Sequence, residues 1–193
     1  AVDCYAKLSG TDDEIHCVYE GGLNGFDEGD SRYLEKIWEK LVKLGIHIHF
    51  YTQADPVYCY KLAEKTKYYH YEGNIASGEL VREMTKYDCG LALFNVTDRN
   101  KTFMETSSFN KVFEYINSGL PVIVGGIQTY DEFVKKYNVG ISLDFNGNIK
   151  EQIATARNIK IPKNFLNDNG FTMKAKAPEL MSFYDEVIKR HVS

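Results

Sequence analysis

The chain has 193 residues, which is enough for one domain with a sizeable core but too few for two full α/β domains. Hydrophobic residues at 44% and charged residues at 26% lie near the averages of globular proteins and argue against the disordered and fibrous classes. The formal net charge of -4 gives no reason to expect a nucleic-acid partner, because affinity for phosphate backbones comes from clustered Lys and Arg.

The first half of the chain alternates short apolar runs with segments of helical period. Residues 15–19 (IHCVY) predict a buried strand. A helix follows, for which Asp30 or Ser31 is the expected cap, because apolar residues recur there at three- and four-residue spacing. Residues 46–52 alternate and are rich in β-branched and aromatic side chains, so they predict a second strand.

The same alternation continues through the middle of the chain. Asp55 is expected to cap a helix over residues 56–65, and residues 68–73 predict a short third strand. A helix over residues 77–86 leads into residues 89–95 (CGLALFN). That continuous apolar run is typical of a central strand in a parallel sheet, which is buried on both faces.

The second half begins with a predicted polar loop over residues 96–108. A helix follows and ends at a glycine-proline break before a fifth strand over residues 121–126. The remaining predicted elements are a helix over 130–137, a strand over 141–145, a helix over 149–157, an irregular segment over 161–172 and a strong helix over 178–192.

Repeated strand–helix–strand units require crossovers that place helices on both faces of a parallel sheet. We therefore predict an α/β fold with a doubly wound, mostly parallel, six-stranded Rossmann-like sheet and a C-terminal helix. The expected organisation is a lead-in segment over residues 1–14, the Rossmann-like domain over 15–160, and a C-terminal extension over 161–193. The closing helix is expected to pack back on the sheet or against another domain.

The cysteines and the hydropathy pattern bear on the compartment. Cys4, Cys17, Cys59 and Cys89 are widely spaced, so we expect reduced, mostly buried thiols and neither a zinc site nor disulfides. No window approaches the roughly 18 apolar residues of a membrane helix. We expect a soluble, cytoplasmic protein.

Ligands of open parallel sheets bind beyond the carboxyl ends of the strands, so the loops at that edge hold the candidate site. Gly21 and Gly22 can bring backbone amides close to a phosphate or sugar, or can form a tight turn only. The hydroxyls of residues 106–108 precede a helix N-terminus, which favours either an anion such as a diphosphate or a simple helix cap. Within that helix, Glu114 can accept hydrogen bonds from paired ribose hydroxyls or lie on a solvated face.

The segment 109–126 (FNKVFEYINSGLPVIVGG) resembles the signature of the C-terminal, nucleotide-sugar-binding domain of two-Rossmann-domain (GT-B) glycosyltransferases, especially the group 1, capsule-type enzymes. IHCVYEGGL, ELVREMTKYDCGLALF and VGISLDF resemble other parts of that domain, so the likeness covers most of residues 15–145. It implies a UDP- or GDP-linked sugar as donor substrate, with no cofactor and no metal ion. It also implies an N-terminal Rossmann domain of the same parent chain as partner, and peripheral association of the parent with the inner face of the membrane.

The resemblance also implies which residues bind the donor. Glu114 matches the family glutamate that holds the ribose hydroxyls. The positions that match the diphosphate cradle are Ser107, Ser108, Asn110 and Lys111. Gly21 and Gly22 match the glycine loop near the pyrophosphate and the acceptor. Gly73, Asn74 and Ile75 match the region where the base rests on backbone groups.

Two departures from the family pattern bear on the site. Many members carry a second, sugar-contacting glutamate where this chain has Thr106, and Glu105 lies one position away. Many also carry an Arg and a Lys after the glycine loop, where this chain has Asn24, Asp27 and Glu28. The phosphate charge is then expected to be met by Lys111, Arg99, Lys101 or the helix dipole.

The leading hypothesis is the donor-binding half of a retaining, metal-independent hexosyltransferase in polysaccharide or glycoconjugate synthesis. We expect it to be inactive alone, because the resemblance places the catalytic base in the N-terminal domain. Two alternatives stay open: a GT-B nucleotide-sugar epimerase fragment, and a non-catalytic scaffold with a degenerate site. The epimerase needs histidine and acidic residues around the sugar, whereas His16 and His70 fall within predicted strands, where core or edge positions are expected.

Overall fold

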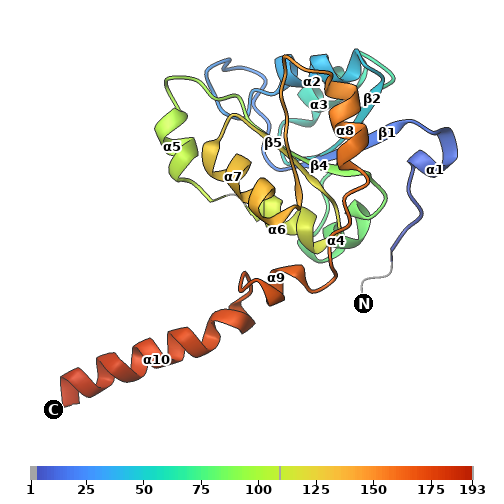
Figure 1. Ribbon diagram of the computed structural model, residues 1–193. Helices are drawn as coiled ribbons and strands as arrows, with labels where there is room; N and C mark the ends of the chain where they lie inside the picture. The colour runs from blue at the N-terminus through green and yellow to red at the C-terminus, as the bar shows by residue number, and fades with distance from the viewer. Residues whose placement is uncertain (1–3, 109, 193) are drawn as a thin grey trace. The chain divides into compact units, whose positions relative to one another are not determined.

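The computed structural model describes residues 4–108 and 110–192 of the chain. The chain divides into two compact units, Ala1–Ile161 and Pro162–Ser193. The first unit holds a six-stranded sheet (Figure 1), and the second unit is helical. Among the described segments, no helix is both long enough and apolar enough to cross a bilayer.

All paired strands of the sheet run parallel, in the order β3-β2-β1-β4-β5-β6. The strands are β1 (Ile15–Glu20), β2 (Ile46–Tyr51), β3 (Tyr69–Gly73), β4 (Cys89–Leu93), β5 (Val122–Gly125) and β6 (Gly140–Ser142). This is the order of the doubly wound Rossmann fold, and it reverses between β1 and β4. The predicted six-stranded parallel sheet is confirmed.

Helices cover both faces of this sheet, as predicted. One face carries α2 (Glu35–Val42), α3 (Pro56–Ala63) and α8 (Ile149–Ala156), and the other carries α4 (Ser77–Met84), α6 (Asn110–Asn117) and α7 (Gln128–Tyr137). On the first face, fully buried Trp38 lies with its ring centroid 5.2 Å from that of Tyr19 and 5.5 Å from that of Phe50. On the second face, Tyr115 lies so close to Gly90 that an added Cβ would sit 2.2 Å from its ring.

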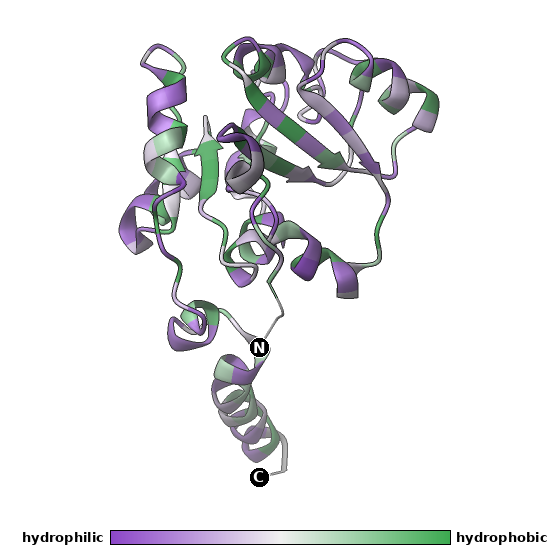
Figure 2. Ribbon diagram, turned by 90° about the vertical axis from the view of Figure 1, so that its right-hand side faces the viewer, coloured by the Kyte–Doolittle hydropathy of each residue, from purple (hydrophilic) through white to green (hydrophobic). Residues whose placement is uncertain are grey.

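Side chains of β2 point alternately to the two faces of the sheet. Ile46, Ile48 and Phe50 join the core under α2 and α3, whereas His47 and His49 point to the opposite face. Bands of green and purple along strands in Figure 2 reflect this alternation of apolar and polar residues. Every residue of β2 is buried, as in a central parallel strand.

Helix starts were predicted with mixed success. The cap of α3 is confirmed, because the Asp55 side chain accepts a hydrogen bond from the Val57 amide at 3.0 Å. The expected cap of α2 is wrong. The Asp30 carboxylate instead accepts from the Arg32 amide at 2.7 Å, which closes a turn ahead of the helix.

The predicted polar loop over residues 96–108 contains a helix, α5 (Lys101–Thr106), so that prediction was wrong there. Amides of Lys101 and Met104 donate to the carbonyls of Thr97 and Asn100 at 2.9 Å. Met104 is fully buried and anchors this turn. One apolar anchor in a polar stretch gives too little periodicity to be recognised.

The glycine-proline break after α6 is confirmed in detail. Gly119 adopts a left-handed φ of 74°, and the Leu120 amide donates to the Tyr115 carbonyl at 2.9 Å. This is the geometry that glycine favours after a helix, and it returns the chain to β5.

The lead-in segment contains the short helix α1 (Ser9–Asp12). The residues that precede α1 are hydrogen-bonded to the end of α4. The Tyr5 amide donates to Thr85 Oγ1 and the Leu8 amide donates to the Lys86 carbonyl, both at 2.9 Å.

The second unit differs from its predicted outline. It contains α9 (Phe165–Asp168) inside the segment expected to be irregular, and α10 (Met173–Val192) begins five residues earlier than predicted. Thr172 sets the earlier start, since its hydroxyl accepts from the Ala175 amide at 3.1 Å. Pro178 therefore lies inside the helix and does not open it.

Candidate functional site

A cavity of about 530 Å³ opens where β1, β2 and β3 end, beside the reversal of strand order. Ligands of open parallel sheets bind at this position. Four residues predicted for the donor site line the cavity, namely Gly21, Gly22, Asn74 and Ile75. Other polar residues also line it: Glu20, Thr52 and Gln53 at the strand ends, and Arg32 from the segment ahead of α2.

The glycine loop lets two cations approach its backbone. Gly21 has a φ of 127°, and a Cβ placed on it would lie 3.1 Å from Lys111 Nζ. A Cβ on Gly22 would lie 3.1 Å from Arg32 Nη1. The Tyr19 hydroxyl donates to the Gly22 carbonyl at 2.6 Å and holds the loop in place. A side chain at either glycine would crowd the positive groups.

Lys111 is a buried cation in the first turn of α6, with 8% of its surface exposed. Its Nζ lies 4.0 Å from the Tyr19 ring centroid and 4.9 Å from that of Phe94. Burial lowers the pKa of Lys111 to about 8, while the charge of Glu20 partly opposes that shift. A lysine that is charged although it is buried is typical of a residue that binds a ligand.

Two carboxyl groups face each other next to this lysine. Burial, with the hydrogen bond and charge of Glu114, raises the pKa of Glu20 to about 7. Glu20 is therefore partly protonated near neutral pH, because burial and a neighbouring carboxylate disfavour its charged form. Glu20 lines the cavity. Glu114 is half-buried and does not line the cavity itself, but it contacts Glu20 through a side-chain hydrogen bond. Such a pair offers acceptors for adjacent hydroxyl groups.

Arg32 lines the cavity but was not predicted as a site residue. Basic residues were expected directly after the glycine loop, whereas Arg32 approaches the loop from the Asp30 turn ahead of α2. The two other cations expected to meet the phosphate charge lie elsewhere. Arg99 pairs with Asp27 at 3.1 Å, and Lys101 pairs with Glu105 at 3.9 Å.

The segment 105–108, which carries the hydroxyl side chains expected at the diphosphate, lines a second hollow of about 280 Å³ together with residues of α7. Glu105, Thr106, Ser107 and Ser108 line this hollow and not the first cavity. The Ser107 hydroxyl donates to the Phe103 carbonyl at 2.6 Å, and the Thr106 hydroxyl donates to the Thr102 carbonyl at 3.0 Å. Both hydroxyl protons are thus engaged by α5.

Two further predicted residues lie at the ends of their elements. Asn110 is the first residue of α6 and is exposed, and residue 109 lies outside the described residues. Gly73 ends β3 with a φ of 80°, and its carbonyl accepts from the Thr52 amide at 3.0 Å. Gly73 adjoins the cavity residue Asn74, and its donor role stays a prediction.

The four strand histidines, His16, His47, His49 and His70, do not line the cavity. Three of them are buried, as expected for core positions. Their grouping was not predicted, because it depends on how the strands pair.

The parallel sheet and the cavity at the carboxyl ends of its strands define a Rossmann-like α/β domain. More particularly, the chain belongs to the family of glucosyltransferase 3-like C-terminal domains, whose model matches residues 33–168.

Among solved structures, the chain is similar to AviGT4, a glycosyltransferase involved in avilamycin A biosynthesis. The two share 14% sequence identity with a TM-score of 0.51, over 78% of this chain and 44% of that one. At that identity the likeness shows the fold alone. The chain thus spans less than half the length of that glycosyltransferase. No curated protein matches the chain.

Proposed function

We propose that this chain is the donor-binding half of a retaining, metal-independent hexosyltransferase that acts in polysaccharide or glycoconjugate synthesis. One observation carries the proposal. At the carboxyl end of the sheet, two cations, Arg32 and Lys111, meet a glycine loop beside the carboxyl pair of Glu20 and Glu114. Positive charge suits a diphosphate, and paired carboxyl oxygens suit vicinal ribose hydroxyls.

The donor is a nucleoside diphosphate sugar with UDP or GDP as its nucleotide. Its diphosphate lies along Gly21 and Gly22, where its negative charge offsets the burial of the Lys111 cation. The ribose hydroxyls donate to the carboxyl pair. The base rests against Asn74 and Ile75 at the far side of the cavity.

Transfer requires stabilisation of the departing diphosphate. Fixed cations and loop amides supply it in this proposal, in place of a divalent ion. The proposal takes two of its features from the family resemblance: the sugar keeps its configuration during transfer, and no metal ion is required. The acceptor site and the catalytic base belong to an N-terminal Rossmann domain of the same parent chain, so the 193-residue chain alone has no appreciable transferase activity. The parent acts in the cytoplasm, in peripheral contact with the inner face of the membrane.

The scaffold alternative rested on the missing basic pair after the glycine loop and on Thr106 in place of the sugar-contacting glutamate. Arg32 and Lys111 supply two cations at the same place from other parts of the sequence, which favours donor binding. The epimerase alternative needs histidine as well as acidic residues at the sugar. The strand histidines lie off the cavity and give it no support.

Calorimetric titration of UDP, GDP and their sugars into the chain tests the proposal. We expect weak but measurable binding, which Glu114→Ala and Arg32→Ala each reduce by about 10- to 100-fold, since charged hydrogen bonds contribute roughly 1.5–3 kcal/mol. Glu39→Ala is the matched control, because Glu39 is an exposed α2 residue that pairs with Lys43. It should bind like wild type.

Two results would overturn parts of the proposal. Absence of binding at millimolar nucleotide would favour the scaffold, and unchanged affinity of Glu114→Ala would remove that residue from the site. Sugar transfer to an acceptor by the chain alone would contradict its inactivity.

A further inference from the structure

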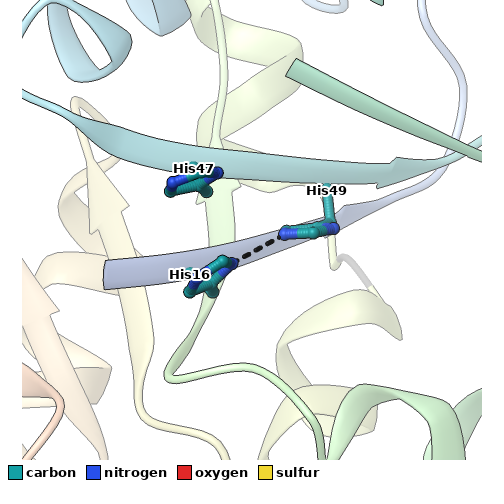
Figure 3. Close-up of side chains that lie close together, drawn as sticks. All are labelled: His16, His47 and His49. Carbon is teal, nitrogen blue, oxygen red and sulfur yellow. Dashed lines mark hydrogen bonds between the residues drawn. The ribbon is translucent and has the colours of Figure 1, made fainter. Parts of the chain in front are cut away.

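Four histidines gather on the sheet face opposite α2 and α3, toward the amino ends of the strands. Three of them, His16, His47 and His49, are drawn in Figure 3 and are 5–7% exposed. The pairing of β1 with β2 sets His16 beside His47, and the pairing of β2 with β3 sets His49 beside His70. Side chains at paired positions of parallel strands point to the same face, so the register itself builds the cluster.

The rings contact one another closely. His16 Nδ1 lies 2.9 Å from His49 Nε2, and His47 Nδ1 lies 2.7 Å from His70 Nε2. The rings of His16 and His47 stack with centroids 4.3 Å apart. One ring nitrogen from each of His16, His47 and His49 lies within 4.8 Å of the others.

A carboxylate faces the outer nitrogen of each of these three rings. Asp12 lies 3.0 Å from His16 Nε2, and Glu72 lies 2.7 Å from His49 Nδ1. Glu14 contacts His47 Nε2 in the same way. A neutral imidazole carries one N–H, and a carboxylate can only accept, so each N–H points outward to its carboxylate.

This leaves the inner nitrogens of His16 and His49 as lone pairs, whereas His47 Nδ1 can accept a hydrogen bond from His70 Nε2. His16 Nδ1 and His49 Nε2 would then be two acceptors facing each other at 2.9 Å, with no hydrogen between them. A positive ion between the rings resolves the conflict. Histidine that donates one N–H to a carboxylate while its other nitrogen binds a metal is a recurring arrangement in metal sites.

We propose that His16, His47 and His49 bind a divalent transition-metal ion of the class that imidazole favours, with Zn²⁺ as its representative. Zinc–nitrogen bonds of 2.0–2.1 Å place tetrahedral ligand atoms about 3.3 Å apart. The 2.9 Å pair must open slightly, and the wider pairs must close from at most 4.8 Å. His47 must also turn out of its stack with His16, because an imidazole nitrogen binds a metal ion in the plane of its ring. Water or His70 completes the coordination.

The ion ties β1 and β2 together across their parallel pairing. Through Asp12 and Glu14 it also fixes the lead-in segment, which carries α1, to this face of the sheet. Its role is structural, and it is independent of the proposed donor chemistry.

The test is titration of the chelator-stripped, 193-residue chain with Co²⁺, followed by competition with Zn²⁺. We expect one Co²⁺ per chain with the intense visible absorption of four-coordinate cobalt, displacement by Zn²⁺, and a higher melting temperature in Zn²⁺. His16→Gln and His49→Gln should each weaken binding at least about tenfold. His191→Gln, which changes the fifth histidine of the chain, is the matched control.

Loss of a buried histidine can also impair folding, so a second variant keeps the test decisive. Glu72→Gln leaves all ligands in place but removes the carboxylate of His49, and should weaken Co²⁺ binding by roughly 10- to 100-fold while the circular dichroism of the chain stays native. Absence of one-to-one binding by the wild-type chain, or equal loss in His191→Gln, overturns the proposal.

Discussion

Replacement of Lys111 with methionine tests whether the fold holds a buried cation for a ligand. Burial lowers the pKa of Lys111 from 10.5 to about 8. Because the folded-state pKa is the lower one, the charge destabilises the fold below about pH 8, and this effect disappears as the pH rises toward 10.5. At about 1.36 kcal/mol per pKa unit, the destabilisation at neutral pH is roughly 3 kcal/mol.

Methionine keeps the apolar contact with Tyr19 but ends the attraction between Lys111 and Glu20. We therefore expect Lys111→Met to raise the free energy of unfolding by about 1–2 kcal/mol, less than the full amount. The same variant should bind UDP at least about tenfold more weakly, because it lacks a charged partner for the diphosphate.

Urea denaturation at pH 7 measures the gain in stability, and calorimetry with UDP measures the loss of affinity. Lys101→Met is the matched control, because the Lys101 side chain is 61% exposed on α5 and pairs with Glu105. It should change neither quantity appreciably. A Lys111→Met chain that is less stable than wild type and binds UDP equally well would refute the reasoning.

Three more predictions concern the fold and its pH dependence. Gly90→Ala should lower the free energy of unfolding by about 1–3 kcal/mol, because the added Cβ would lie 2.2 Å from the Tyr115 ring. Gly78→Ala is the control, since a Cβ at Gly78 would have no neighbour within 4 Å. It should show no such loss in the same urea titration. Asp55→Ala should lower the melting temperature through loss of about 1 kcal/mol of helix capping, and an unchanged value would contradict the role of that cap. Glu20 has a folded pKa of about 7, above the ordinary 4.5, so its protonated form stabilises the fold at low pH and this contribution is lost as the pH rises through about 7. Glu20→Gln should therefore gain stability relative to wild type between pH 5 and pH 8, and a constant difference across that window would disprove the shift.

The sheet was predictable because each strand carries its own signal. β2 alternates isoleucine with histidine and β4 is continuously apolar, so their positions needed no knowledge of their partners. The crossover rules predicted a parallel sheet with helices on both faces, whereas the strand order β3-β2-β1-β4-β5-β6 came from the structure. By contrast, α5 has a single buried anchor, Met104, and no pattern in the sequence marks it.

The candidate site was predicted in part for a similar reason. Gly21 and Gly22 adjoin a strand end, so topology alone places them at the ligand edge. Arg32 reaches them only through the turn that Asp30 closes, which local patterns did not predict. The signal that could have found it is its position as the first arginine after the glycine loop.

The histidine cluster shows a different limit of sequence reasoning. His16, His47 and His70 are each the second residue of a strand, but only the β3-β2-β1 order and its register bring them together. A comparison of equivalent positions across the predicted strands would have revealed the coincidence. Single-strand patterns could not.

The most direct test of the central claim is to map UDP and GDP binding onto the backbone amides of the ¹⁵N-labelled chain by NMR. Donor binding in the cavity predicts saturable shifts at Gly21, Gly22, Asn74 and Ile75, and loss of those shifts in Glu114→Ala. Shifts confined to the segment around Ser107 and Ser108, or no saturable shifts with either nucleotide, would contradict it.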